Sequence, residues 1–330
     1  MPTARPVLLV GCPRSGTTLL SVMLHAHPRI AMPPETRFLL PIYRARNAFG
    51  DLTLRRNRLA LGRRITRRGN FSHLELNRRA VVRAIADGPP SIGSALAIVW
   101  REFARSRGKA RWGEKRPMYW QHMDWVLRLF PDAQVVHLIR DPRACVASLQ
   151  SVHWWHGGLH GAVATWALAD QELRRFGRGV PSDSYHALYY EDLMRDPRSE
   201  LARLCGFLDE DFDAGMLEYS SAAGDIVPAR KTWHALTHRP PDPSRTERWR
   251  STLTRDEIAL IERVLARPMR RHGYESSGTT GRARPADVAC YELERTRRLV
   301  RMRAIHAADR MQRRHELQPV AADPSLSAPG

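Results

Sequence analysis

The sequence predicts an α/β fold, in which a mostly parallel sheet is flanked by helices, with an inserted helical layer at about residues 40–110 and a basic helix after residue 280. Short apolar runs at 7–10, 135–139 and 185–190 have the length and composition of buried parallel strands. A segment with helical spacing follows each run. Strands that alternate with helices favour a parallel sheet with helices on both faces.

The first half of the chain contains two strand–helix units. The run at 7–10 leads through a glycine-rich turn into a helix expected over 17–25, whose leucine and methionine side chains lie on one side. The arginine-rich layer at 40–110 has apolar residues at helical spacing. The second strand, at 135–139, is followed by an expected helix at 144–151.

The second half adds a third unit and a helical end. A strand over 185–190 precedes a helix expected over 199–208. Residues 221–250 are irregular and rich in Pro, Arg and Trp, which is typical of a loop over a site. A capping-box pattern that begins at Thr254 predicts a helix that runs to about Arg271.

These elements predict two parts of the chain. Residues 1–280 form one α/β domain that includes the helical insertion, and residues 281–330 form an extension. The extension is expected to hold a basic amphipathic helix over 286–317 and then a disordered tail that is rich in Pro, Ala and Ser.

The composition concentrates positive charge. The 330 residues carry a net charge of +19, and nearly all of it comes from arginine because only three lysines occur. Such a field attracts anions, whether nucleic acid, an anionic membrane surface or a polyanionic nucleotide. The four cysteines are widely spaced, and no run of about 18 apolar residues could span a membrane. We therefore expect a cytoplasmic protein without a transmembrane segment.

A phosphate-binding loop is predicted at residues 11–18, Gly-Cys-Pro-Arg-Ser-Gly-Thr-Thr, between the first strand and the first helix. Two glycines five residues apart let backbone N–H groups surround an anion, and the helix N-terminus adds partial positive charge. The expected sheet is therefore of the P-loop type. Thr17 occupies the position of the lysine that nucleoside triphosphatases place on their phosphates, which disfavours triphosphate chemistry. Arg14 supplies a cation inside the loop instead.

This loop carries a resemblance to a known family. The segment Pro-Arg-Ser-Gly-Thr-Thr-Leu-Leu at 13–20 resembles the 5′-phosphosulfate loop of sulfotransferases that use 3′-phosphoadenosine 5′-phosphosulfate (PAPS). The stretches at 25–28 and 35–37 are similar to the tyrosylprotein sulfotransferase branch and its bacterial relatives. The resemblance implies that the loop binds the donor nucleotide through Pro13, Arg14, Ser15, Gly16, Thr17 and Thr18.

A second stretch, at 138–148, resembles the 3′-phosphate element of the same family. The resemblance implies that Arg140 and Ser148 hold the 3′-phosphate. A guanidinium and a hydroxyl at the carboxyl end of a strand suit that role, because ligands of α/β folds bind at this edge.

Weaker matches concern single residues. The resemblance implies that Lys115 contacts the transferring group and that Tyr190 lies near the adenine. Arg239 and Trp249 resemble the late nucleotide-binding loop of the family.

The resemblance also implies a mechanism, in which a sulfuryl group passes to an acceptor hydroxyl by in-line displacement. Glu35 would act as the general base, while Arg14 and Lys115 would stabilise the leaving phosphate. The family often has two successive glutamates where this chain has Pro34 and Glu35. The alternative role of Glu35 is a simple ion pair with Arg37.

Donor, acceptor and partners follow from this interpretation. PAPS would be the co-substrate and 3′-phosphoadenosine 5′-phosphate (PAP) the product, without a metal, since the sequence has no carboxylate cluster for Mg²⁺. The acceptor would be a hydroxyl of a small molecule, a glycan or a peptide, and the sequence does not choose among them. A homodimer is left open.

Two other interpretations compete with this one. The first is a P-loop nucleotide kinase or NTPase-like protein, which would need a lysine at position 17. The second is a non-catalytic basic protein that binds nucleic acid or an anionic membrane through the helix at 286–317. Nucleic acid is disfavoured, because a basic amphipathic helix is more often a solvated or packing face.

Overall fold

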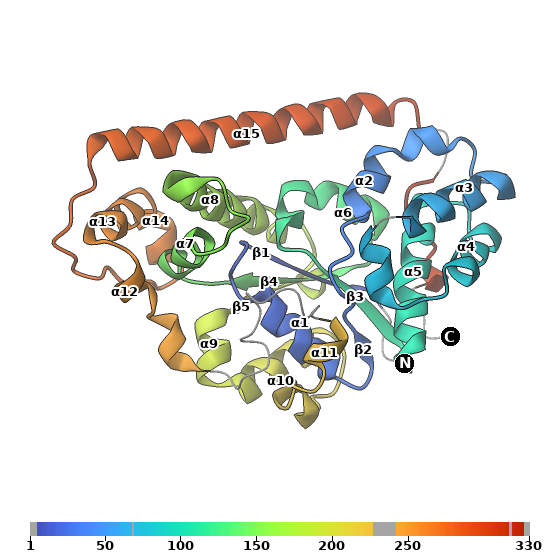
Figure 1. Cartoon of the computed structure of the whole chain (residues 1–330), viewed down its shortest axis with the longest axis horizontal. Helices are drawn as coiled ribbons and strands as arrows, with labels where there is room; N and C mark the ends of the chain where they lie inside the picture. The colour runs from blue at the N-terminus through green and yellow to red at the C-terminus, as the bar shows by residue number, and fades with distance from the viewer. Residues whose placement is uncertain (1–4, 68, 227–241, 317–318, 327–330) are drawn as a thin grey trace.

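The computed structural model describes residues 5–67, 69–226, 242–316 and 319–326. Five parallel strands form one sheet in the order β2-β3-β1-β4-β5 (Figure 1). The strands are β1 (Val7–Gly11), β2 (Ile30–Ala31), β3 (Arg111–Lys115), β4 (Gln134–Ile139) and β5 (Tyr185–Tyr189). The predicted parallel sheet is confirmed, and β1 is its central strand.

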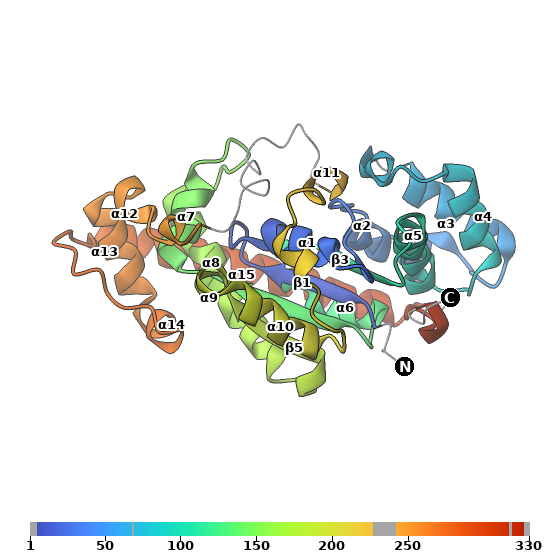
Figure 2. The ribbon, with the colours of Figure 1, turned by 90° about the horizontal axis from the view of Figure 1, so that it is seen from below.

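Helices cover both faces of the sheet (Figures 1 and 2). On one face lie α1 (Thr17–Ala26) and α10 (Pro197–Phe207). On the other face lies α8 (Gly158–Gly177), with α15 (Pro285–Arg313) packed against it. The remaining helices outside the inserted layer are α6 (Met123–Leu129), α7 (Pro142–Gln150), α9 (Tyr190–Arg195), α11 (Ala223–Ile226), α12 (Trp249–Thr252), α13 (Arg255–Val264) and α14 (Ala266–Arg271).

The inserted helical layer is confirmed. Between β2 and β3 the chain forms α2 (Leu39–Arg44), α3 (Arg55–Thr66), α4 (Arg78–Asp87) and α5 (Ile92–Ser106). These helices lie at one end of the molecule, beyond the β2 edge of the sheet (Figure 1). Side-chain caps from Asn77 and Ser91 begin α4 and α5, because each accepts a hydrogen bond from a backbone N–H of the first turn.

The strands end together at one edge of the sheet. Leu9 of β1 is in register with Lys115 of β3 and with Val136 of β4. The carboxyl ends of the three central strands therefore reach the same edge, which is where α/β folds bind ligands.

Strands β2 and β3 were not predicted from the sequence. β3 is buried at all five positions although it contains Arg111, Glu114 and Lys115. The guanidinium of Arg111 is satisfied inside the fold, since Nε donates to the carbonyl of Arg5 at 2.7 Å and Nη1 lies 3.4 Å from a carboxylate oxygen of Glu210. A strand that buries paired charges does not have the apolar composition by which buried strands are recognised.

The capping box predicted at Thr254 is present at the start of α13. The Thr254 hydroxyl accepts a hydrogen bond from the Glu257 backbone N–H, and the Glu257 carboxylate accepts one from the Thr254 N–H. The predicted helix divides at Leu265 into α13 and α14.

The basic helix α15 is tied to distant parts of the chain. The buried carboxylate of Asp309 lies 2.8 Å from Nη2 of the buried Arg46. His306 donates through Nε2 to the carbonyl of Gln121 at 2.7 Å. The boundary at about residue 280 stays a prediction.

The chain beyond α15 differs from the expected disordered tail. Val320 accepts a hydrogen bond from the backbone N–H of Gly93 at 2.8 Å, and Ala322 donates one to the carbonyl of Leu129 at 2.7 Å. Val320 and Leu326 are buried in the core cluster. The prediction of disorder rested on composition, which carries no information on hydrogen bonds with residues as distant in the chain as those of α5 and α6. The prediction is wrong for residues 319–326.

Candidate active site

The phosphate-type loop occupies the turn between β1 and α1. Gly16 caps α1 with φ of +101°, a left-handed conformation that favours glycine, and a Cβ there would lie 2.5 Å from Cδ2 of Tyr190. Arg14 also has a positive φ, of +72°. The first turn of α1 contains no acidic residue, so nothing there opposes an anion at the helix N-terminus.

The two predicted phosphate elements meet in space. Nε of Arg14 donates to Oγ of Ser148 at 3.0 Å, and Nη1 of Arg140 donates to the carbonyl of Arg14 at 3.2 Å. Burial, followed by the positive charge of Arg140, lowers the pKa of Arg14 from its usual value. Two guanidinium groups held this close inside a protein favour binding of an anion. The roles of these residues stay predictions, and their proximity is a structural fact.

Two polar atoms beside the loop lack a hydrogen-bond partner among the described residues. Oγ of Ser15 and Nε of Arg140 are buried and make no hydrogen bond within the described residues. Buried polar groups are rarely left without a partner unless a ligand, ion or water completes them. The Tyr190 ring forms the wall of this region, because the Arg140 guanidinium lies 4.2 Å from its centroid. A phosphate group fits these donors.

Lys115 and Glu35 lie on the other side of the loop. Nζ of Lys115, at the carboxyl end of β3, is 3.4 Å from Oγ1 of Thr18 and 3.5 Å from Oε2 of Glu35. Lys115 is 6% exposed and the Glu35 side chain 14%, so both are shielded and still reachable. The structure therefore brings the predicted base and the predicted cation into contact.

Glu35 also makes the contact expected from its alternative role. Its Oε1 accepts a hydrogen bond from Nε of Arg37 at 3.0 Å. The Arg37 side chain is 60% exposed, so this ion pair contributes little to stability. Glu35 therefore makes both contacts, one with Lys115 and one with Arg37.

Glu114 is a second carboxyl in this region that sequence reasoning missed. It is fully buried, and its Oε1 accepts hydrogen bonds from the hydroxyls of Thr36 and Tyr119 at 3.2 and 3.1 Å. Burial, followed by the negative charge of Glu35, raises the pKa of Glu114 to about 8. Its other oxygen has no hydrogen-bond partner among the described residues. The signal in the sequence was a glutamate directly before Lys115, but only the fold shows that it is buried.

The residues predicted for the late nucleotide-binding loop are divided. Arg239 lies outside the described residues. Trp249 is buried between two guanidinium groups, with Arg143 at 4.1 Å and Arg250 at 4.4 Å from its ring centroid. The nearby carbonyl of Arg245 accepts a hydrogen bond from the Arg140 side chain at 3.5 Å. This segment therefore lies beside the phosphate elements, while Trp249 itself packs against α7.

Among the described residues, no group of three or more His, Cys, Asp or Glu side chains is placed to hold a metal ion. Over the same part of the chain, no helix combines the length and the apolar character needed to cross a bilayer.

The fold and the loop define the class of protein, an α/β protein of the P-loop type with cations gathered at the carboxyl edge of a parallel sheet. The chain belongs to the sulfotransferase family, which matches it over residues 6–214. This membership confirms the resemblance noted in the sequence.

Two curated relatives illustrate the family. The chain is 28% identical over 302 residues to the nodulation protein NoeE of Sinorhizobium fredii, covering 82% of this chain and 66% of that protein. It is 25% identical over 278 residues to protein-tyrosine sulfotransferase A of Caenorhabditis elegans, covering 82% of this chain and 67% of that protein. The chain thus spans about two thirds of the length of these relatives.

Solved structures agree with the fold. The sulfotransferase domain of the Synechococcus PCC 7002 olefin synthase is 28% identical with a TM-score of 0.52, covering 79% of this chain and 94% of that domain. The sulfotransferase domain of the curacin biosynthetic pathway has a TM-score of 0.55 at 19% identity, covering 82% of this chain and 98% of that domain, which is a likeness in fold alone.

Proposed function

We propose that the chain transfers a sulfuryl group from PAPS to an acceptor hydroxyl. The observation that supports this most is the contact of the two phosphate elements, because Arg14, Ser148 and Arg140 form one cationic cluster. A donor with phosphates at both its 3′ and 5′ ends needs two such elements close together. Membership of the sulfotransferase family supports the same reaction.

Binding of the donor is assigned to residues already brought together. The loop N–H groups and Arg14 would hold the 5′-phosphosulfate, and Arg140 with Ser148 would hold the 3′-phosphate. Tyr190, under the loop, would lie beside the adenosine.

The chemistry is a displacement at sulfur. The acceptor oxygen forms a bond to sulfur while the bond from sulfur to the bridging oxygen breaks, and negative charge develops on the leaving phosphate. Arg14 and Lys115 would stabilise that charge. Glu35, in contact with Lys115 at 3.5 Å, would take the proton of the acceptor hydroxyl. A metal has no assigned part in these steps.

The acceptor is assigned only by class, as a hydroxyl of a small molecule, a glycan or a peptide. The relative named protein-tyrosine sulfotransferase A favours a peptidyl hydroxyl as one candidate. Acceptor pockets vary independently of the fold, so this likeness is analogy.

The direct test is PAP binding, measured through the thermal unfolding of the protein. PAP at saturation should raise the Tm, because a ligand that binds only the folded state stabilises it. Arg140→Ala and Ser148→Ala should weaken PAP binding much more than binding of adenosine 5′-phosphosulfate, which lacks the 3′-phosphate. Arg195→Ala, at an exposed position on α9, is the control. Equal losses for both ligands would remove the 3′-phosphate assignment, and absence of any PAP shift in the parent protein would contradict the proposed function.

The non-catalytic alternative predicts a different pattern. Binding driven only by the net charge should fall steeply with salt and should not depend on Arg14. Arg14→Ala therefore separates a nucleotide site from a general anion-binding surface.

A further inference from the structure

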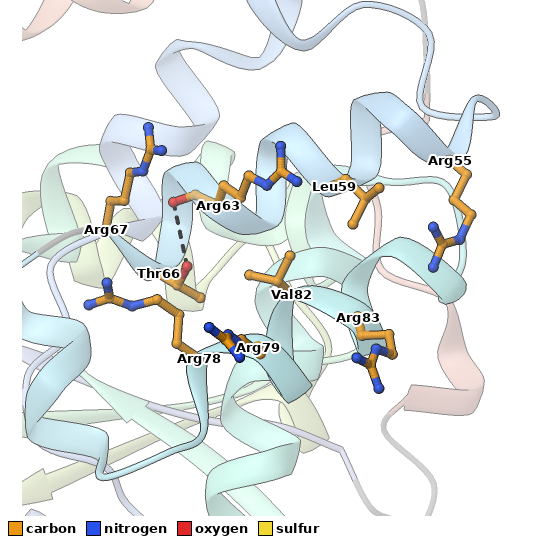
Figure 3. Close-up of a pocket in the computed structure, with 9 residues that line it drawn as sticks. All are labelled: Arg55, Leu59, Arg63, Thr66, Arg67, Arg78, Arg79, Val82 and Arg83. Carbon is orange, nitrogen blue, oxygen red and sulfur yellow. Dashed lines mark hydrogen bonds between the residues drawn. The ribbon is translucent and has the colours of Figure 1, made fainter.

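Helices α3 and α4 of the inserted layer line a strongly basic pocket that is open to solvent (Figure 3). The cavity has a volume of about 570 Å³. The arginines that line it come from both helices and from the residue after α3: Arg55, Arg63, Arg67, Arg78, Arg79 and Arg83. We call this hollow the arginine pocket.

The arginine pocket has an apolar interior. Leu59 of α3 and Val82 of α4 lie between the arginines, with Thr66 at one end (Figure 3). Helix α3 has 12 residues and is therefore about 18 Å long, so guanidinium groups are distributed along the hollow. The shape suits an elongated ligand with several anionic groups better than a single small ion.

The charge of the arginine pocket is poorly neutralised by the protein. Arg55 pairs with Asp87 at 2.8 Å. The other five arginines of the pocket have no carboxylate partner within the described residues. Glu75, on the segment between the two helices, pairs with Arg107 at 3.0 Å instead. Like charges gathered on one surface repel each other, and a bound polyanion would relieve that repulsion.

The arginine pocket is connected to the candidate active site. The segment that follows α3 includes Asn70, whose Nδ2 donates to the carbonyl of Glu35 at 3.0 Å. Asn70 is only four residues beyond Thr66. The chain that follows the Thr66 end of the pocket therefore contacts the backbone of Glu35.

We infer that the arginine pocket binds the acceptor through several sulfate or phosphate groups on it, while the acceptor hydroxyl lies at Glu35. Guanidinium groups recognise such oxyanions in bidentate fashion, which surface charge alone does not achieve. The aliphatic side chains of Leu59 and Val82 would contact the neutral backbone of the ligand between its anions. The assignment to the acceptor rests on the proposed function, whereas the anion site itself does not.

The binding test uses the full chain and a fluorescein-labelled heparin tetrasaccharide as the sulfated probe. Fluorescence anisotropy at about 0.15 M NaCl limits the long-range part of the attraction. The pocket variant is Arg63→Gln/Arg79→Gln. Its control, Arg56→Gln/Arg64→Gln, removes the same charge at exposed positions of α3 that do not line the pocket.

The pocket variant should bind the probe about tenfold more weakly or worse, because it loses charge-assisted hydrogen bonds, and the control should stay within about threefold of the parent. Saturating PAP should leave the probe affinity unchanged. Equal losses in both variants, displacement of the probe by PAP, or no binding by the parent protein would overturn the anion site. Tighter binding of a short single-stranded DNA, lost in the same pocket variant, would overturn the acceptor class in favour of nucleic acid.

A second measurement links the pocket to the acceptor. In transfer of ³⁵S from PAPS to acceptors of a cell extract, the unlabelled tetrasaccharide should compete with the acceptor and not with PAPS. The competition should be lost in Arg63→Gln/Arg79→Gln. Inhibition that is competitive with PAPS, or independent of the acceptor concentration, would overturn the acceptor assignment. Absence of any transfer would contradict the proposed function. The anisotropy measurement would still decide whether the arginine pocket is an anion site.

Discussion

Glu35 and Glu114 are two carboxyls with different surroundings. Glu35 contacts Lys115 near the loop, whereas Glu114 is enclosed by the hydroxyls of Thr36 and Tyr119. Carboxyls that differ in this way commonly have separate tasks. Glu35 contacts Lys115, and Glu114 accepts a hydrogen bond from Thr36, the residue that follows Glu35.

Replacement of Glu35 tests its role as the base. We expect Glu35→Gln to lower turnover by about 10²-fold or more, because the acceptor proton loses its recipient, while PAP affinity stays unchanged. Rates with the ³⁵S transfer assay and PAP thermal shifts measure the two effects. Unchanged turnover would limit the role of Glu35 to its ion pairs with Arg37 and Lys115.

Glu114 should make stability depend on pH. Its pKa is about 8 in the folded protein, above the ordinary value of 4.5, so the folded state binds more protons between these values. Its contribution to stability is therefore fully present below pH 4.5 and is lost as the pH rises through 8.

Glu114→Gln removes that dependence and keeps the shape of the protonated carboxyl. Relative to the parent, the variant should gain stability as the pH rises from 5 to 8, by at most about 1.4 kcal/mol per pH unit. Urea unfolding at several pH values measures this. A difference between the two proteins that does not vary with pH would contradict the buried, protonated state.

At the scale of residues, the sequence predicted the loop and its partners because their spacing is local. Arg14, Arg140 and Ser148 each belong to a short motif, and a short motif can be recognised in the sequence without knowledge of the fold. Glu114 could not be assigned in this way, since its burial depends on pairing with β1 and on contacts with Thr36 and Tyr119.

At the scale of elements, the helix α15 shows both what the sequence predicts and what it does not. Its existence and basic character followed from composition and periodicity. The burial of Asp309 against Arg46 did not, because Arg46 follows α2 and is far from α15 in the chain. Strand β3 was missed for a related reason, since the partners of its buried Arg111 come from distant parts of the chain.

The ion pair of α15 can be tested by substitution. We expect Asp309→Asn to lower the free energy of unfolding by about 3 kcal/mol, because Arg46 is 1% exposed and loses a buried partner. Glu292→Gln, on the same helix, is the control. Glu292 is exposed and lies 3.9 Å from Arg295, so its replacement should change stability very little. Equal effects in the two variants would show that α15 does not depend on this pair.

At the scale of the whole molecule, three buried histidines should make the folded protein less stable at acidic pH. Burial lowers the pKa of His25 to about 4 and the pKa values of His122 and His137 to about 3. A histidine whose pKa is lowered by folding binds a proton more readily when unfolded. Its contribution to stability is present above pH 6.5 and is lost as the pH falls toward the folded value.

His137→Asn should reveal one part of this loss. The variant is expected to be less stable at pH 7, because His137 hydrogen bonds to the Tyr185 hydroxyl at 2.7 Å. Between pH 6.5 and 4 it should lose less stability than the parent, by up to about 1.4 kcal/mol per pH unit. Parallel pH profiles of the two proteins in urea unfolding would contradict the prediction.

The packing of residues 320–322 also has a consequence for biosynthesis. Backbone groups of α5 and of Leu129 find their partners in Val320 and Ala322, which leave the ribosome long after α5 and α6 have emerged. In a chain that folds from its N-terminus during synthesis, the Gly93 N–H and the Leu129 carbonyl therefore lack these partners until residues 320–322 have been made. Nascent chains stalled before residue 319 should accordingly bind chaperones at the surface of α5 and α6 that residues 320–322 cover. Chains that include these residues should lose that association.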